Sequence, residues 1–194
     1  MWPARSALRP VPAHAVVPSE AVDAVESELA DTGDLESSID QAFRELDATQ
    51  PDLARFLSGE LEGVTDETAE ALGQFLGVTV HHAFTEAFGA RLRRVDETAI
   101  ATARALYDFD EELRRGAADE MLESDDLVAI GQPHLVAFVR EQLEAALEPD
   151  EDGEPADVDL DAVATVYRAV LIEILVLGQS VAAPRGVTTT ENFV

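Results

Sequence analysis

The sequence predicts an all-α protein, and three observations lead to this prediction. Apolar residues recur at spacings of three and four along most of the chain, which is the period of a helix with one buried face. Proline, serine or aspartate stands where these stretches begin, and glycine often stands where they end. No stretch shows the alternation of apolar and polar residues that marks a half-buried strand. We therefore expect a single bundle-like domain of about six or seven helices.

Four helices are expected in the first half of the chain. Ser19 and either Thr65 or Asp66 stand at cap positions, and Pro51 suits the first turn of a helix. Gly63 and Gly89 are placed where two of these helices should end. The expected ranges are 19–31, 35–46, 51–62 and 66–88.

The second half is expected to hold three long helices, and a further short one is left open. Arg114 and Arg115 form a cationic last turn before Gly116, which is a usual helix ending. The run AVLIEILVL at residues 169–177 is apolar almost all round, so it should be the central buried element. The expected ranges are 96–115, a short helix at 118–122, 133–147 and 159–180.

The ends of the chain differ from the helical body. Residues 1–18 contain four prolines and are expected to be disordered or extended, residues 19–183 form the all-α domain, and residues 184–194 form a flexible tail. Prolines interrupt the first segment, so no signal-peptide core is expected. Residues 169–177 are too short for a bilayer span of roughly 20 residues. We expect a cytoplasmic protein with no membrane association.

Acidic residues dominate the charge of the chain. The 194 residues include 40 Asp and Glu against 13 basic residues, all arginine, and the formal net charge is -27. Such a surface repels phosphate, which disfavours direct binding of nucleic acid. The composition is typical of a halophile, and nucleic-acid mimicry or docking of a basic partner are the alternatives. Salt screens self-repulsion, so stability should rise with added NaCl.

A short pattern indicates an internal repeat. Gln50-Pro51 is followed by apolar residues at the same spacing as Gln132-Pro133, with an offset of 82 residues. Residues 50–88 and 132–180 are therefore expected to form two pseudo-symmetric helical hairpins. Chance recurrence of proline-started helices is the alternative. Aligning Asp66 with Asp157 would place His82 opposite Glu173.

Glu173 is the most unusual titratable residue, because apolar residues flank it on both sides of a helix expected to be buried. His82 and Glu86 share one helix face at a spacing of four residues, and together with His134 and Glu173 they form a candidate polar site. A bundle-edge position or an ion pair with arginine would give Glu173 a purely structural role. The Glu-x-x-His and His-Glu-x-x-His patterns of known metal sites are absent.

An acidic loop offers a second candidate site. Its oxygen-bearing residues are Glu148, Asp150, Asp152, Glu154 and Asp159, with glycine at the sixth position. The spacing resembles the calcium loop of the EF-hand family, which implies a weak divalent-metal site. The loop departs from that family at its first position, where Glu148 replaces the usual aspartate, and at its last, where Asp159 replaces the usual glutamate. A solvated loop is the alternative.

Arg91, Arg93 and Arg94 form the basic patch outside the chain ends. They are expected either to cap the preceding helix and form salt bridges or to take an acidic ligand.

The absent motifs narrow the function. The chain has no cysteine, no Gly-x-Ser-x-Gly and no lysine for a phosphate loop, which disfavours catalysis. We expect an interaction or regulatory protein without catalysis and without a cofactor. Its expected partner is another protein, for which a basic protein is one candidate. A homodimer is left open. The alternatives are a small-ligand sensor or enzyme with an enclosed polar site near Glu173 and His82, and a weak divalent-metal-binding protein.

Overall fold

A computed structural model describes residues 6–31, 35–115, 123–149, 156 and 158–184. The structure is 79% helical with no strands among these residues, which confirms the all-α single domain. The described elements include eight α-helices and two short 3₁₀ turns, at 13–15 and 89–91. The helices are α1 (Ser19–Asp31), α2 (Leu35–Thr49), α3 (Pro51–Leu61), α4 (Glu67–Phe88), α5 (Glu97–Arg115), α6 (Ser124–Gly131), α7 (Pro133–Ala146) and α8 (Leu160–Ser180).

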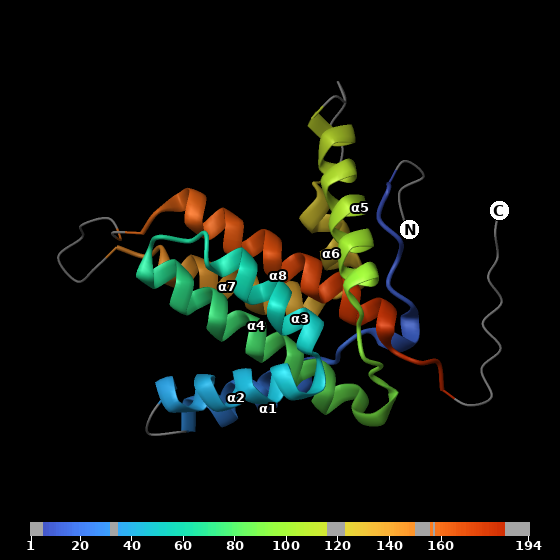
Figure 1. Ribbon diagram of the computed structural model, residues 1–194, viewed down its shortest axis with the longest axis horizontal. Coiled ribbons are helices and arrows are strands. Elements are labelled where there is room, and N and C mark those ends of the chain that lie inside the picture. The colour runs from blue at the N-terminus through green and yellow to red at the C-terminus, as the bar shows by residue number, and fades with distance from the viewer. Residues whose placement is uncertain (1–5, 32–34, 116–122, 150–155, 157, 185–194) are drawn as a thin grey trace.

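Helices α4 and α8 form the centre of the molecule and contact each other along their length (Figure 1). Both begin at an aspartate cap: Asp66 accepts a hydrogen bond from the Ala69 N–H, and Asp159 accepts one from the Asp161 N–H. The Asp159 N–H also donates to Asp66 Oδ2 at 2.8 Å, so the two helices start side by side. Helices α1 and α2 cover one side of this pair, and α5 stands upright near the end of α8.

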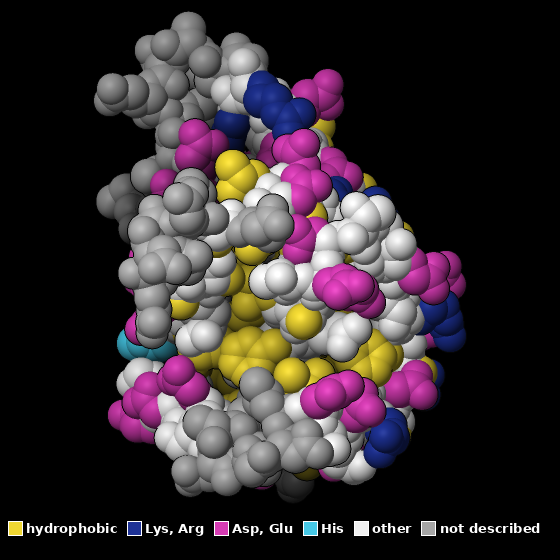
Figure 2. Space-filling model, turned by 90° about the vertical axis from the view of Figure 1, so that its left-hand side faces the viewer, with side chains coloured by type: hydrophobic (Ala, Val, Ile, Leu, Met, Phe, Trp, Pro, Cys, Tyr) yellow, Lys and Arg dark blue, Asp and Glu magenta, His cyan; other side chains and the backbone are white. Residues whose placement is uncertain are grey.

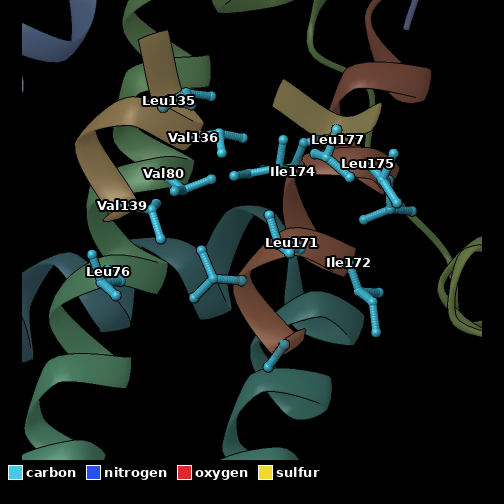
Figure 3. Packing of buried hydrophobic residues seen from close by; sticks show 14 of the residues in the cluster. Leu76, Val80, Leu135, Val136, Val139, Leu171, Ile172, Ile174, Leu175 and Leu177 are labelled. Atoms are coloured by element: carbon cyan, nitrogen blue, oxygen red, sulfur yellow. The ribbon is translucent and has the colours of Figure 1, made fainter. Parts of the chain in front are cut away.

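The hydrophobic core lies where α4, α7 and α8 meet (Figure 3). Helix α8 is buried on every side from Ala169 to Gly178, as its apolar sequence predicts. The side chains that meet in this close view come from all three helices and are Leu76, Val80, Leu135, Val136, Val139, Leu171, Ile172, Ile174, Leu175 and Leu177.

Residues 6–18 take the extended form, which the sequence analysis gave as one of two alternatives, with a short 3₁₀ turn at 13–15. Four of their apolar side chains, Leu8, Val11, Ala15 and Val17, are buried in the core. Gly131 permits this docking, because a Cβ atom at that position would lie 2.9 Å from a Val11 methyl group. The prolines therefore fix an extended segment against the helices. Of the tail expected at 184–194, only Pro184 is within the described residues.

Most expected helices are confirmed within a few residues, and α6 is the exception. No helix is predicted from the sequence at Ser124–Gly131, while the short helix expected at 118–122 lies outside the described residues. Helix α6 has only eight residues, so its apolar period is too short to recognise.

The two halves of the chain make parallel contacts. Exchanging α1, α2, α3 and α4 with α5, α6, α7 and α8 reproduces the same helix pairs: α1 packs on α4 as α5 packs on α8, and α3 packs on α8 as α7 packs on α4. The pseudo-symmetric hairpins expected at 50–88 and 132–180, and their origin by duplication, stay a prediction. The register differs from the expected one, because the cap of α8 is Asp159. Matching the two caps places Val80, rather than His82, opposite Glu173.

Two glutamines connect these halves. Gln50 precedes α3 and Gln132 precedes α7, and both side chains are buried. The Gln132 amide accepts from the Val17 N–H at 2.8 Å and donates to the Ala15 carbonyl at 2.6 Å. Gln50 does the same for the Val95 N–H at 2.8 Å and the Arg93 carbonyl at 3.1 Å. Each glutamine thus holds the extended segment that leads into a helix of the other half.

Candidate functional site

Glu173 lies in the interior of the protein. Its side chain is fully buried, and neither carboxyl oxygen has a hydrogen-bond partner. It faces α4 at Gly77, where an added Cβ would lie 3.6 Å from Glu173 Oε2 and 3.1 Å from a Leu57 methyl group. Burial raises the pKa of Glu173 well above its ordinary value, because no neighbouring charge or donor favours the ionised form. Burial therefore favours the neutral form of the Glu173 carboxyl group.

The other members of the candidate polar site lie elsewhere. His82 is half-buried on α4, with its Nε2 3.5 Å from a carboxylate oxygen of Glu45, whereas Glu86 and His134 are exposed. No group of three His, Asp or Glu side chains in the described part of the chain is placed to hold a metal ion. The structure therefore does not bring these four residues together into one site.

His81, which precedes His82 on α4, is buried and was not among the candidate site residues. Its Nε2 lies 3.2 Å from Thr49 Oγ1, and its Nδ1 has no hydrogen-bond partner. Burial, together with the neighbouring His82, lowers the pKa of His81 to about 4, so the ring is neutral at pH 7.

The acidic loop falls largely outside the described residues. Asp150, Asp152 and Glu154 are not described, Glu148 is exposed, and the described side-chain contact of Asp159 is its cap of α8. The calcium-like site therefore stays a prediction.

The basic patch stands beside a surface pocket. Arg91 stacks on the ring of Phe88, with 5.1 Å from the guanidinium carbon to the ring centroid. Arg93 and Arg94 are exposed and line the pocket, and Arg9 from the extended N-terminal segment lines it as well. We call this feature the arginine pocket. Its volume is about 560 Å³, within the ~300–1,000 Å³ usual for ligand sites.

The walls of the arginine pocket come from four segments. The N-terminal segment, the stretch before α5, the first turns of α5 and the end of α8 all contribute. Its apolar lining residues are Leu8, Val95, Ala99, Ala103, Leu106, Leu175, Val176 and Val181. Its polar lining is Thr98, Thr102, Gln179, Ser180 and Asp96, and the last of these accepts a hydrogen bond from the Ala99 N–H at the start of α5.

Three arginines of the pocket have no carboxylate partner among the described residues: Arg9, Arg93 and Arg94. Apart from these and Arg91, every described arginine forms an ion pair, namely Arg44, Arg55, Arg104, Arg114, Arg115, Arg140 and Arg168. A second pocket of about 500 Å³, between α5, α6 and α8, shows the contrast. Its two arginines, Arg115 and Arg168, already bind carboxylates.

Gln50 positions two of these arginines. Its amide holds the backbone of residues 93 and 95, and the Arg93 N–H also donates to the Ser180 carbonyl at 3.3 Å. On the other wall, the Gln179 amide donates to the Pro10 carbonyl at 2.9 Å, beside Arg9. The glutamine before each proline-started helix was visible in the sequence as part of the repeat. The distant segments that its side chain binds were not.

The fold and the pocket define an all-α protein with a cationic, apolar-floored surface site. Comparison with protein-family models, with curated proteins and with solved structures finds no match. Within the described residues, no helix has the length and apolar character needed to cross a bilayer.

Proposed function

We propose that this protein is a non-catalytic binding protein, and that the arginine pocket binds an anionic group attached to an apolar body. The observation that supports the proposal is that Arg9, Arg93 and Arg94 have no carboxylate partner among the described residues, in a chain of net charge -27. With forty acids available, arginines at a structural surface would be expected to pair, as every other described arginine except Arg91 does. Three unpaired guanidinium groups beside an apolar floor suit a ligand that brings its own negative charge.

The lining also favours binding over catalysis. Its acid, Asp96, caps α5, and the Ser180 hydroxyl donates to the Leu177 carbonyl at 2.7 Å. Neither group is paired with a base in the way that a nucleophile or proton-transfer residue requires. The enclosed-site hypothesis has less support, since Glu173 and His82 line neither this pocket nor the two others of about 500 and 370 Å³. A cytoplasmic location, a basic partner elsewhere on the surface and a homodimer remain part of the proposal.

Binding of an aromatic sulfonate tests this function directly. The dye 1-anilinonaphthalene-8-sulfonate combines an anion with an apolar body, and its fluorescence rises in apolar surroundings. We expect saturable binding that decanoate displaces and decanol does not. Replacing two arginines, Arg93→Gln with Arg94→Gln, should weaken dye binding by about tenfold or more, because hydrogen bonds to charged groups contribute roughly 1.5–3 kcal/mol.

The matched control is Arg55→Gln, which removes an exposed arginine that pairs with Asp52 on α3, away from the pocket. Its dye affinity should equal that of the unchanged protein. Equal displacement by decanol and decanoate, or full binding by the double variant, would rule out the proposed site.

A further inference from the structure

The apolar surface of the arginine pocket continues along α5. Leu106 lines the pocket, and Phe109 and Leu113 follow it at spacings of three and four residues. Phe109 is 53% exposed and Leu113 is 43% exposed, although both are large hydrophobic residues. The buried face of α5 is a different one, formed by Ile100, Tyr107 and Asp110. The exposed side chains therefore form a second face, which no described part of the protein covers.

The length of this face indicates the size of its ligand. From Ala99 in the pocket to Leu113 is 14 residues, which corresponds to about 21 Å along a helix axis. A single small carboxylic acid would fill the pocket and leave Phe109 and Leu113 exposed. A peptide helix of about four turns would cover both.

Charge defines the polarity of the ligand. The three arginines without carboxylate partners lie at the start of α5, whereas Asp108 and Glu112 are exposed near its other end. At this end Arg168 binds Asp108, Arg114 binds Asp110 and Arg115 binds Glu111, so among the described residues Glu112 is the charge left without an ion-pair partner and this end is weakly acidic. A complementary segment would carry its acidic residues at one end only, over the arginines, with apolar residues along the rest.

We propose that the arginine pocket and the exposed face of α5 together bind an amphipathic helix of a partner protein, with its acidic end on Arg9, Arg93 and Arg94 and its apolar face on Leu106, Phe109 and Leu113. This inference rests on the proposed function, since it assigns a class of ligand to the same pocket. The remaining surface of the protein is strongly acidic and would repel such a helix. The arginine end therefore determines both where the helix binds and in which direction it runs.

A pair of model peptides tests the inference. Both are labelled 16-residue helices with leucine at helical spacing and glutamine at the other positions. They differ only in the first turn, where the non-leucine positions of one peptide carry glutamate instead of glutamine. Anisotropy is measured in 0.5 M NaCl, which screens the general repulsion of the acidic surface. We expect the glutamate peptide to bind at least tenfold more tightly than the glutamine peptide. The double change Arg93→Gln with Arg94→Gln should remove this difference.

A change in α5 separates this inference from the proposed function. Phe109→Ser should weaken binding of both peptides by tenfold or more and leave binding of the aromatic sulfonate unchanged. Leu160→Ser is the matched control, because Leu160 is 67% exposed at the opposite end of α8. It should alter neither.

Each other outcome overturns a specific claim. If the sulfonate binds but neither peptide does, or if Phe109→Ser leaves peptide affinity unchanged, the pocket takes a small anion only and the helix proposal is wrong. If the peptides bind equally well, the arginines do not orient the ligand and the proposed polarity is wrong. If the sulfonate fails to bind, the proposed function itself is wrong.

Discussion

Asp110 and Glu173 are both completely buried acids, yet their surroundings are opposite. Asp110 accepts hydrogen bonds from the Ala7 N–H at 2.7 Å, from the hydroxyls of Ser6 and Ser124 at 2.9 Å each, and from the Arg114 guanidinium. Glu173 accepts none. The first acid ties the N-terminal segment, α5 and α6 together, while the second lies among apolar side chains of the central helices.

The difference shows that burial alone does not decide what an acid does to a protein. Burial by itself raises the pKa of Asp110. The hydrogen bonds from Arg114, Ala7, Ser124 and Ser6 lower this pKa by more than burial raises it, so the net shift is downward. At neutral pH Asp110 is therefore charged and stabilising. Glu173 lacks any such donor among the described residues, so burial raises its pKa and its two oxygens leave hydrogen-bonding capacity unused.

The largest effect is expected for Asp110→Ala. The change removes the acceptor of four hydrogen bonds and the carboxylate that binds the Arg114 side chain, which is only 6% exposed. Breaking a buried ion pair costs about 3–5 kcal/mol, and we expect a loss of that size in the free energy of urea unfolding. The control is Asp40→Ala, since Asp40 is exposed and lies 3.7 Å from Arg44. That variant should lose less than about 1 kcal/mol, and equal losses in the two variants would contradict the distinction.

A smaller effect of the opposite sign is expected for Glu173→Leu. Leucine has a similar volume and removes a buried carboxyl group that has no partner. An unsatisfied buried polar group costs about 1–3 kcal/mol, so the variant should be more stable than the original protein by about that amount at pH 8. Urea unfolding at this pH measures the change. A clear loss of stability would show that Glu173 has an interaction in the folded state that the geometry does not contain.

The pH dependence of stability gives a finer test. A raised pKa in the folded state means that the contribution of Glu173 is complete below its ordinary pKa of 4.5 and is lost as pH rises through the folded value. Stability should therefore decrease toward alkaline pH, with a limiting slope of about 1.4 kcal/mol per pH unit for one proton. Glu173→Gln should abolish this slope. For Asp110 the lowered pKa gives the reverse, a loss of stability as pH falls through the folded value.

The smallest effect is expected for salt, acting on the changes in stability that the substitutions of the two acids cause. Added NaCl should raise the melting temperature of every variant, because it screens repulsion on a surface of net charge -27. Buried groups are screened much less than exposed ones. The stability differences of Asp110→Ala and Glu173→Leu from the unchanged protein should therefore remain the same between 0.2 and 2 M NaCl. A difference that shrinks with salt would indicate that solvent reaches the carboxyl group.

The burial of Glu173 could be predicted from the sequence, because its apolar neighbours along α8 are adjacent in the chain. The hydrogen bonds that Asp110 accepts from Ser6 and Ala7 could not, since these donors lie more than a hundred residues away. The same distinction explains the arginine pocket. Arg93 and Arg94 stood out as a basic cluster, but Arg9 reaches the pocket only because the N-terminal segment docks on distant helices.

For the fold too, the features set by local interactions could be predicted from the sequence, and those set by long-range contacts could not. Caps and apolar spacing along the chain identify the long helices, since every interaction involved lies within a few residues. The docking of Val11 depends on Gly131, which is distant in sequence, so the sequence alone leaves residues 6–18 either disordered or extended. The candidate set His82, Glu86, His134 and Glu173 required helices to face each other in a register that sequence spacing does not determine.

The two glutamines also bear on the order in which the chain can fold. Gln132 binds a segment 115 to 117 residues earlier in the chain, so the start of the protein must wait for most of the molecule to be synthesised before its backbone is paired. Gln50 binds forward, to a segment that follows the first four helices. Each half therefore supplies contacts that the other needs, and neither half has all of its native contacts by itself. Long-range contacts of this kind slow folding, because a long stretch of chain has to close into a loop before they form.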